Sequence, residues 1–269
     1  MLLISRVDLV RDPNRSVFWA RERPPRVVPG MSDRICHQFL RSCAAISSYS
    51  AGVERLLIAA ADLWRATGAG DRLRLIGGLA VHLYVGAAAR VTADIDVVCM
   101  DEQARAAVSR RLEALGYRLG VTARWIRAVD PTGQQPVVDV SSHPVVDLRR
   151  FENVALHGPP RHHDVEGINL ALAAPDDLAL LKLVAARDQD CVDLLVLAGA
   201  VPLSATAIAR RAERDDIERS VAQGAGYLRH LLSTGALAEI AEEALGRAMT
   251  AAEPATLGGL LAQLEKEGL

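Results

Sequence analysis

LIGGLAVHLYVGAAARVTADIDVV, residues 75–98, is the stretch that decides the fold. Its apolar opening predicts a short buried strand. Gly77 and Gly78 follow, where the backbone must turn sharply or approach a ligand closely. The mostly apolar residues after them predict a short helix that ends at Gly86. Polar and apolar residues then alternate from Asp94, which predicts a second strand.

The second predicted strand carries two aspartates on one face. In an extended chain Asp94 and Asp96 project to the same side, roughly 7 Å apart, while Ile95 and Val97 face the core. Two carboxylates beside a glycine turn repel each other unless a cation lies between them. Mg²⁺, a hard divalent cation that carries substrate phosphates, fits such a pair. A solvated strand face is the alternative for an Asp-x-Asp taken alone.

The order of these features resembles the nucleotidyltransferase signature, in which a glycine pair is followed by a helix and then by Asp-x-Asp in a strand. The form GGLAVHLYVGAAARVTADID is similar to the AbiEii/MenT-type nucleotidyltransferase toxins of the DNA polymerase beta-like superfamily. It also resembles small antibiotic nucleotidyltransferases. The resemblance covers about residues 75–198 and is strongest at its two ends.

The resemblance implies two Mg²⁺ ions, with Mn²⁺ as a substitute, bound by Asp94 and Asp96. In the resembled family a third carboxylate on a neighbouring strand completes the metal site, and Asp139 holds the matching position. Asp139 follows the turn at Gly133 as a hairpin's return strand would, so we prefer it and expect it to take the proton of the attacking hydroxyl. Asp147, in nearly the same context, is the alternative third carboxylate.

Lysine is rare in this chain. Only Lys182 and Lys266 among the 31 basic residues are lysine. Lys182 lies in an apolar run that follows Pro175, a residue typical of a helix start. Because arginine is the default cation here, this lysine predicts a specific role, as a phosphate ligand that faces a cleft. A cation at a helix edge, with its stem on apolar surface, is the alternative.

Two further acids follow this lysine. AbiEii-type proteins carry a basic residue and then Asp-x-x-Asp in this part of the chain. Here the element reads QDCVD, with Asp190 and Asp193 as its acids and with no basic residue directly before it, although Arg187 is near. One unbroken helix would separate Lys182 from Asp193 by about 16 Å. A shared site therefore requires a helix break near residues 188–190, where an aspartate would cap a second helix.

The predicted reaction is nucleotidyl transfer, in which a nucleoside monophosphate passes from a nucleoside triphosphate (NTP) to an acceptor and pyrophosphate leaves. Gly77, Gly78, Arg90 and Lys182 are expected to face the nucleotide, with Asp190 and Asp193 as weaker candidates. The catalytic set consists of Asp94, Asp96, Asp139 and Lys182. The resemblance implies the 3′ end of a tRNA as acceptor and an antitoxin as partner. The alternatives are transfer to an antibiotic hydroxyl and a non-catalytic member that binds only nucleotide or a partner.

The expected fold is α+β, a nucleotidyltransferase-like mixed β-sheet core with flanking helices followed by a helical C-terminal domain. We expect an N-terminal arm over 1–32, the core over 33–170 and the helical domain over 171–269. Patterns within the core predict helices over 33–67 and 101–116 and strands over 117–119, 124–128 and 136–140.

Composition supports a globular protein. Half of the 269 residues are apolar and a quarter are charged, and no apolar run is long enough for a membrane span, so the expected location is the cytoplasm. The net charge of −2 argues against general polyanion binding but not against a local basic patch. The four cysteines are scattered and predict neither zinc nor disulfides. The HHD sequence at 162–164 fits no zinc spacing and predicts a solvated loop.

Overall fold

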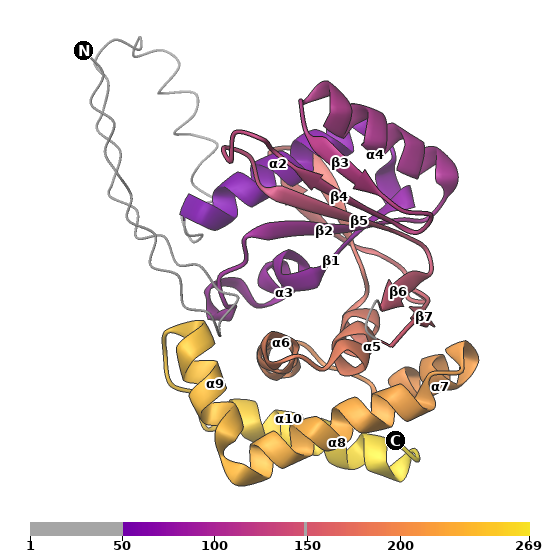
Figure 1. Ribbon diagram of the computed structural model, residues 1–269. Helices are drawn as coiled ribbons and strands as arrows, with labels where there is room; N and C mark the ends of the chain where they lie inside the picture. The colour runs from indigo at the N-terminus through magenta and orange to yellow at the C-terminus, as the bar shows by residue number, and fades with distance from the viewer. Residues whose placement is uncertain (1–50, 148–149) are drawn as a thin grey trace, which may run out of the picture. The chain divides into compact units, whose positions relative to one another are not determined.

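The computed structural model describes residues 51–147 and 150–269 (Figure 1). The predicted arm over 1–32 and the first half of the predicted helix over 33–67 lie outside the described residues. The division into an arm, a core and a helical domain stays a prediction.

Seven strands form one mixed sheet. They are β1 (Leu73–Ile76), β2 (Asp94–Cys99), β3 (Arg118–Val121), β4 (Trp125–Val129), β5 (Val137–Ser142), β8 (Arg161–Val165) and β9 (Ile168–Leu172). Their order across the sheet is β3-β4-β5-β2-β1-β9-β8. The pairs β2–β5 and β1–β9 are parallel, and the other neighbours are antiparallel. A separate hairpin consists of β6 (Val145–Asp147) and β7 (Glu152–Val154).

Helices cover both faces of the sheet (Figure 1). On one face lie α2 (Ala51–Thr67) and α4 (Glu102–Ala114), which contact each other and the sheet, and on the other lies α3 (Gly77–Val85). Asp101 caps α4, because its Oδ1 accepts the backbone N–H of Ala104 at 2.7 Å. The main hydrophobic core is formed by the buried faces of β1 and β2, with Leu73, Leu75 and Ile95 almost fully buried.

Every regular element described after β9 is a helix. These helices are α5 (Pro175–Ala185), α6 (Asp188–Ala200), α7 (Ala205–Asp215), α8 (Glu218–Thr234), α9 (Ala236–Leu245) and α10 (Ala252–Lys266). They enclose a second hydrophobic cluster, which includes Leu183, Leu195 and Ile208. The helices α5 and α8 approach closely at Gly224, where a Cβ atom would lie 1.9 Å from the carbonyl oxygen of Leu183. The predicted α+β fold, a mixed sheet with flanking helices followed by a helical part, is confirmed.

Most predicted elements of the core are present within one or two residues of the expected positions. The solvated loop predicted at the two adjacent histidines is wrong, because β8 is an edge strand that pairs with β9. His162 reaches from it to Asp71, with 2.7 Å between Nε2 and Oδ1. In the part of the chain that the structure describes, no helix is long and apolar enough to cross a membrane.

Candidate metal and nucleotide site

The glycine pair lies directly under the acidic strand. Gly77 is the first residue of α3 and has a φ of 68°, which favours glycine. A Cβ atom there would lie 1.9 Å from Oδ2 of Asp96, and a Cβ at Gly78 would lie 2.8 Å from Oγ1 of Thr92. Neither position has room for a side chain, so the backbone of the β1–α3 turn lies against the acids.

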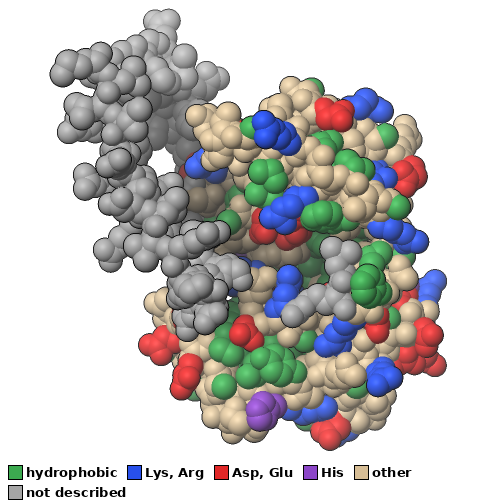
Figure 2. All heavy atoms as spheres, in the orientation of Figure 1, with side chains coloured by type: hydrophobic (Ala, Val, Ile, Leu, Met, Phe, Trp, Pro, Cys, Tyr) green, Lys and Arg blue, Asp and Glu red, His purple; other side chains and the backbone are tan. Residues whose placement is uncertain are grey.

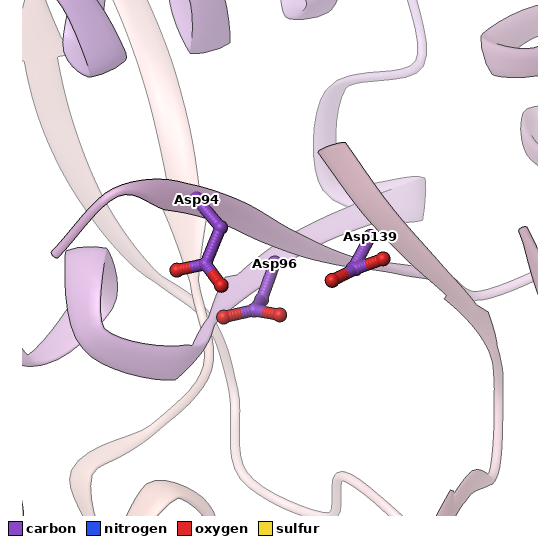
Figure 3. Close-up of side chains that lie close together, drawn as sticks. All are labelled: Asp94, Asp96 and Asp139. Carbon is purple, nitrogen blue, oxygen red and sulfur yellow. The ribbon is translucent and has the colours of Figure 1, made fainter. Parts of the chain in front are cut away.

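Three carboxylates converge beside this turn. Because β2 and β5 are parallel and in register, Asp96 and Asp139 are direct partners, and Asp94 lies on the same face of β2 (Figure 3). Each of the three offers an oxygen, and these oxygens all lie within 4.8 Å of one another. Asp147 lies on β6, outside the seven-stranded sheet. The structure therefore brings Asp139, and not Asp147, together with the first two acids.

Burial and neighbouring negative charge destabilise the ionised forms of Asp96 and Asp139. Burial raises the pKa of Asp96 to about 7, and the negative charges of Asp94 and Asp139 add to this rise, while Lys182 and Arg187 oppose it. Burial also raises the pKa of Asp139, against the lowering effect of Arg127. A bound cation would relieve this repulsion.

The oxygen atoms of Asp139 differ in their partners. Its Oδ2 accepts a hydrogen bond from Arg127 at 3.2 Å, whereas its Oδ1 is buried and has no hydrogen-bond partner among the described residues. Oδ1 of Asp94 accepts from the hydroxyl of Thr92 at 3.0 Å. An unpartnered buried oxygen among carboxylates fits a hard divalent cation such as Mg²⁺ or Mn²⁺.

The helix break that a shared site requires is present, directly before residues 188–190. Helix α5 ends at Ala185, the next residue, Ala186, has a left-handed backbone with a φ of 44°, and α6 begins at Asp188. The Nζ atom of Lys182 consequently lies 2.8 Å from Asp190 and 2.7 Å from Asp193. The residue that precedes α6 is Arg187 rather than the expected aspartate, and Asp190 accepts its backbone N–H at 3.3 Å.

Two arginines extend this group of charges. Arg90 donates to both oxygens of Asp193, at 2.9 and 3.0 Å, and Nε of Arg187 lies 2.6 Å from Asp190. We call these five residues, Arg90, Asp193, Lys182, Asp190 and Arg187, the charge chain. It holds three cations and two acids and therefore carries a net positive charge. Figure 2 shows acidic and basic side chains gathered at a hollow in this face of the molecule.

The surroundings of Lys182 differ from both interpretations of this residue, the phosphate ligand in a cleft and the cation at a helix edge. Its side chain is only 7% exposed, so it is not a cation at a helix surface. It already has two carboxylate partners, so any contact with a phosphate would be shared with them.

The sequence did not reveal Arg127 as a neighbour of Asp139, and it did not show that Arg187 lies close enough to Asp96 to affect its charge. Arg127 is the register partner of Asp139 across β4 and β5. Alignment of the two predicted strands as a hairpin would therefore have placed these two residues side by side. Arg187 comes near Asp96 because Ala186, the residue before it, has a left-handed backbone. No glycine or proline in the sequence indicates that conformation.

No protein-family model matches the sequence, and no curated protein matches it. Structural comparison finds similar solved structures. MenT4, a nucleotidyltransferase toxin from Mycobacterium tuberculosis, has 17% identity and a TM-score of 0.48, over 89% of this chain and 92% of that chain. An antigenic nucleotidyltransferase-like protein from Paracoccidioides brasiliensis has 15% identity and a TM-score of 0.41, over 64% and 93%. ANT(2")-Ia, in complex with adenylyl-2"-tobramycin, has 14% identity and a TM-score of 0.40, over 60% and 92%.

Proposed function

We propose that the protein is a metal-dependent nucleotidyltransferase. The observation that supports this most directly is the convergence of Asp94, Asp96 and Asp139, with an unpartnered oxygen on Asp139, beside a turn that has no room for side chains. A hydroxyl oxygen of the acceptor forms a bond to the α-phosphorus of an NTP, the bond from that phosphorus to the bridging oxygen breaks, and pyrophosphate leaves.

Asp94, Asp96 and Asp139 would hold one or two divalent cations, Mg²⁺ or Mn²⁺. When bound, such a cation neutralises charge on the triphosphate and makes the attacking hydroxyl more acidic. Asp139 is also the residue that we propose accepts the hydroxyl proton.

The phosphates would lie between the β1–α3 turn and the charge chain. The backbone N–H groups of Gly77 and Gly78 are the first of α3, where unpaired donors and the helix dipole favour anions. Lys182 on α5, Arg187 between α5 and α6, and Arg90 in the loop before β2 would supply the net positive charge. Asp190 and Asp193 position these cations and need not contact the nucleotide themselves.

We further propose that the acceptor is the 3′ end of an RNA, in particular a tRNA, and that the protein acts as a toxin that an antitoxin restrains. The sequence resemblance of the glycine pair, the Asp-x-Asp strand and the region after Pro175 supports this choice. The side chain of Arg187 is 48% exposed, so it remains accessible to a polyanion.

The test is transfer of label from each of the four α-labelled NTPs to total tRNA, to an unstructured RNA oligonucleotide and to an aminoglycoside, with Mg²⁺. We expect labelled tRNA with the wild type and loss of nearly all transfer with Asp96→Asn. Asp164→Asn is the matched control, because it changes an exposed acid on the edge strand β8, outside the cluster, and it should retain transfer. Labelled aminoglycoside without labelled RNA would contradict the RNA acceptor, and transfer by Asp96→Asn at the wild-type rate would contradict the site.

A further inference from the structure

The strand that carries the acids has a second face. Ile95 lies between Asp94 and Asp96 along β2, so it points to the opposite side of the sheet. Its register partner across β5 is Val138, the neighbour of Asp139. These two apolar residues, 1% and 3% exposed, form the floor of a groove of about 360 Å³. The groove therefore lies directly behind the acids.

Most of the lining of the groove is apolar, although Asp62 and two glutamines also line it. Helix α2 contributes Ile58 and Leu63, and the C-terminal end of α4 contributes Leu112, with Leu115 directly after it. Ile58 is 37% exposed and Leu115 is 46% exposed, although large apolar side chains at a helix surface are usually covered when they lie side by side. The volume and the apolar lining are those of pockets that bind small molecules.

One cation lies at the mouth of this groove. The guanidinium of Arg55 donates to the backbone carbonyl of Gln134, and no carboxylate among the described residues forms an ion pair with it. The nearby Asp62 is already neutralised by Arg111 at 2.7 Å. Asp130, in the loop that leads to Gln134, accepts from the hydroxyl of Thr132 and from three backbone N–H groups.

Among the described residues this guanidinium bonds to a neutral carbonyl, and it would gain more from an anion, because a charge-assisted hydrogen bond is about twice as strong as a neutral one. Its planar pair of N–H groups matches a carboxylate. A polyphosphate would need more than one cation, and the groove offers one. We propose that the groove binds a small apolar molecule that bears a single carboxylate, with the apolar part over Ile95 and Val138 and the carboxylate on Arg55.

The experiment measures binding of octanoate and of octan-1-ol to the full chain by calorimetry, without metal or nucleotide, so its outcome is independent of the proposed function. Octanoate should bind more tightly than the uncharged alcohol. Arg55→Gln should weaken octanoate binding about tenfold or more and leave octan-1-ol binding unchanged. Arg65→Gln, an exposed arginine on the same helix outside the groove, is the matched control and should change neither.

A second variant tests the groove itself. Ala59→Phe places a ring in the space between the walls and should abolish binding of both ligands. Circular dichroism and thermal unfolding establish whether Ala59→Phe folds. Ile58→Ser, at an exposed position of the groove, is a milder change that should weaken the binding of both ligands. The proposal is overturned if octanoate does not bind, if Arg55→Gln binds it as the wild type does, or if binding is lost instead in Arg229→Gln, which lines a smaller depression on the C-terminal helices.

Discussion

Asp96 and Gly77 occupy one space in this fold. The carboxylate of Asp96 fills the position that a side chain at residue 77 would need, with 1.9 Å between Oδ2 and an ideal Cβ. Gly77 also has a φ of 68°, so the backbone alone disfavours any other residue. Glycine is therefore required at residue 77 for two reasons. A side chain there would collide with the Asp96 carboxylate, and the backbone has a positive φ.

Gly77→Ala should reduce nucleotide transfer while the protein still folds. The methyl group would push the Asp96 carboxylate away from Asp94 and Asp139, so nucleotide transfer should fall by two or more orders of magnitude, about 3 kcal/mol in activation free energy. Gly133→Ala provides a control, because Gly133 also has a positive φ but has open space around its Cβ position. Wild-type transfer by Gly77→Ala would contradict the tight approach of the turn to the acids.

Removal of the Asp96 charge should stabilise the metal-free protein. The folded-state pKa of Asp96 is raised to about 7, whereas an unfolded aspartate has a pKa of about 3.9. The folded chain thus holds an extra proton between these values, and stability falls as the pH rises from about 4 to 7. Asp96→Asn should therefore raise Tm at pH 8 and raise it less at pH 5. Each kcal/mol gained in the free energy of unfolding corresponds to about 2–4 °C in Tm. Equal gains at both pH values would contradict the raised pKa.

Divalent metal should stabilise the wild type by binding only the folded chain. Addition of Mg²⁺ or Mn²⁺ should raise Tm with the logarithm of metal concentration once sites fill. Asp139→Asn should lose most of this gain, because it removes the charge of the unpartnered oxygen. A shift of equal size in Asp139→Asn and the wild type would place the metal elsewhere.

Lys182→Met should destabilise the fold as well as the reaction. The change leaves the buried carboxylates of Asp190 and Asp193 without their shared partner, a loss of about 3–5 kcal/mol for a broken buried pair. The value should lie at the lower end, because Arg187 and Arg90 remain. Lys266→Met, at the last residue of α10, is the control and should unfold in urea as the wild type does. A double change with Asp190→Asn should cost less than the sum of the single changes.

Two glycines of α8 should respond in opposite directions to the same substitution. Gly224→Ala would place a methyl group against the carbonyl of Leu183 and should destabilise by about 1–3 kcal/mol or more. Gly226→Ala meets nothing within 4 Å and should stabilise by up to about 1 kcal/mol through helix propensity. Urea unfolding of both variants gives the comparison. Equal effects would contradict the close approach of α5 and α8.

The sequence was informative where a local pattern determines structure. The alternation at Asp94–Cys99 predicted both the strand and the shared face of Asp94 and Asp96, since side chains in a strand have period two. It was less informative at Ala186, a residue with no preference for the left-handed backbone that it adopts. The contacts of Lys182 with Asp190 and Asp193 depend on the turn at Ala186. From the sequence they could be stated only on the condition that the helix breaks there.

Other features depend on packing between distant segments. The polar sequence of β8 shows no apolar alternation, because an edge strand is exposed on more sides than a central one. The groove behind Ile95 and Val138 exists only where α2 and the end of α4 meet over the sheet. No local pattern specifies that space, although each of its walls was predicted.

The bond between Arg90 and Asp193 has a consequence for motion. Arg90 precedes β2, and Asp193 lies on α6, so one planar pair of hydrogen bonds joins the sheet to the helices that follow it. Such a pair breaks as a unit, because a small rotation misaligns both bonds together. The pair therefore fixes the angle between the loop before β2 and helix α6 as well as their distance, since a bidentate pair adds geometric specificity.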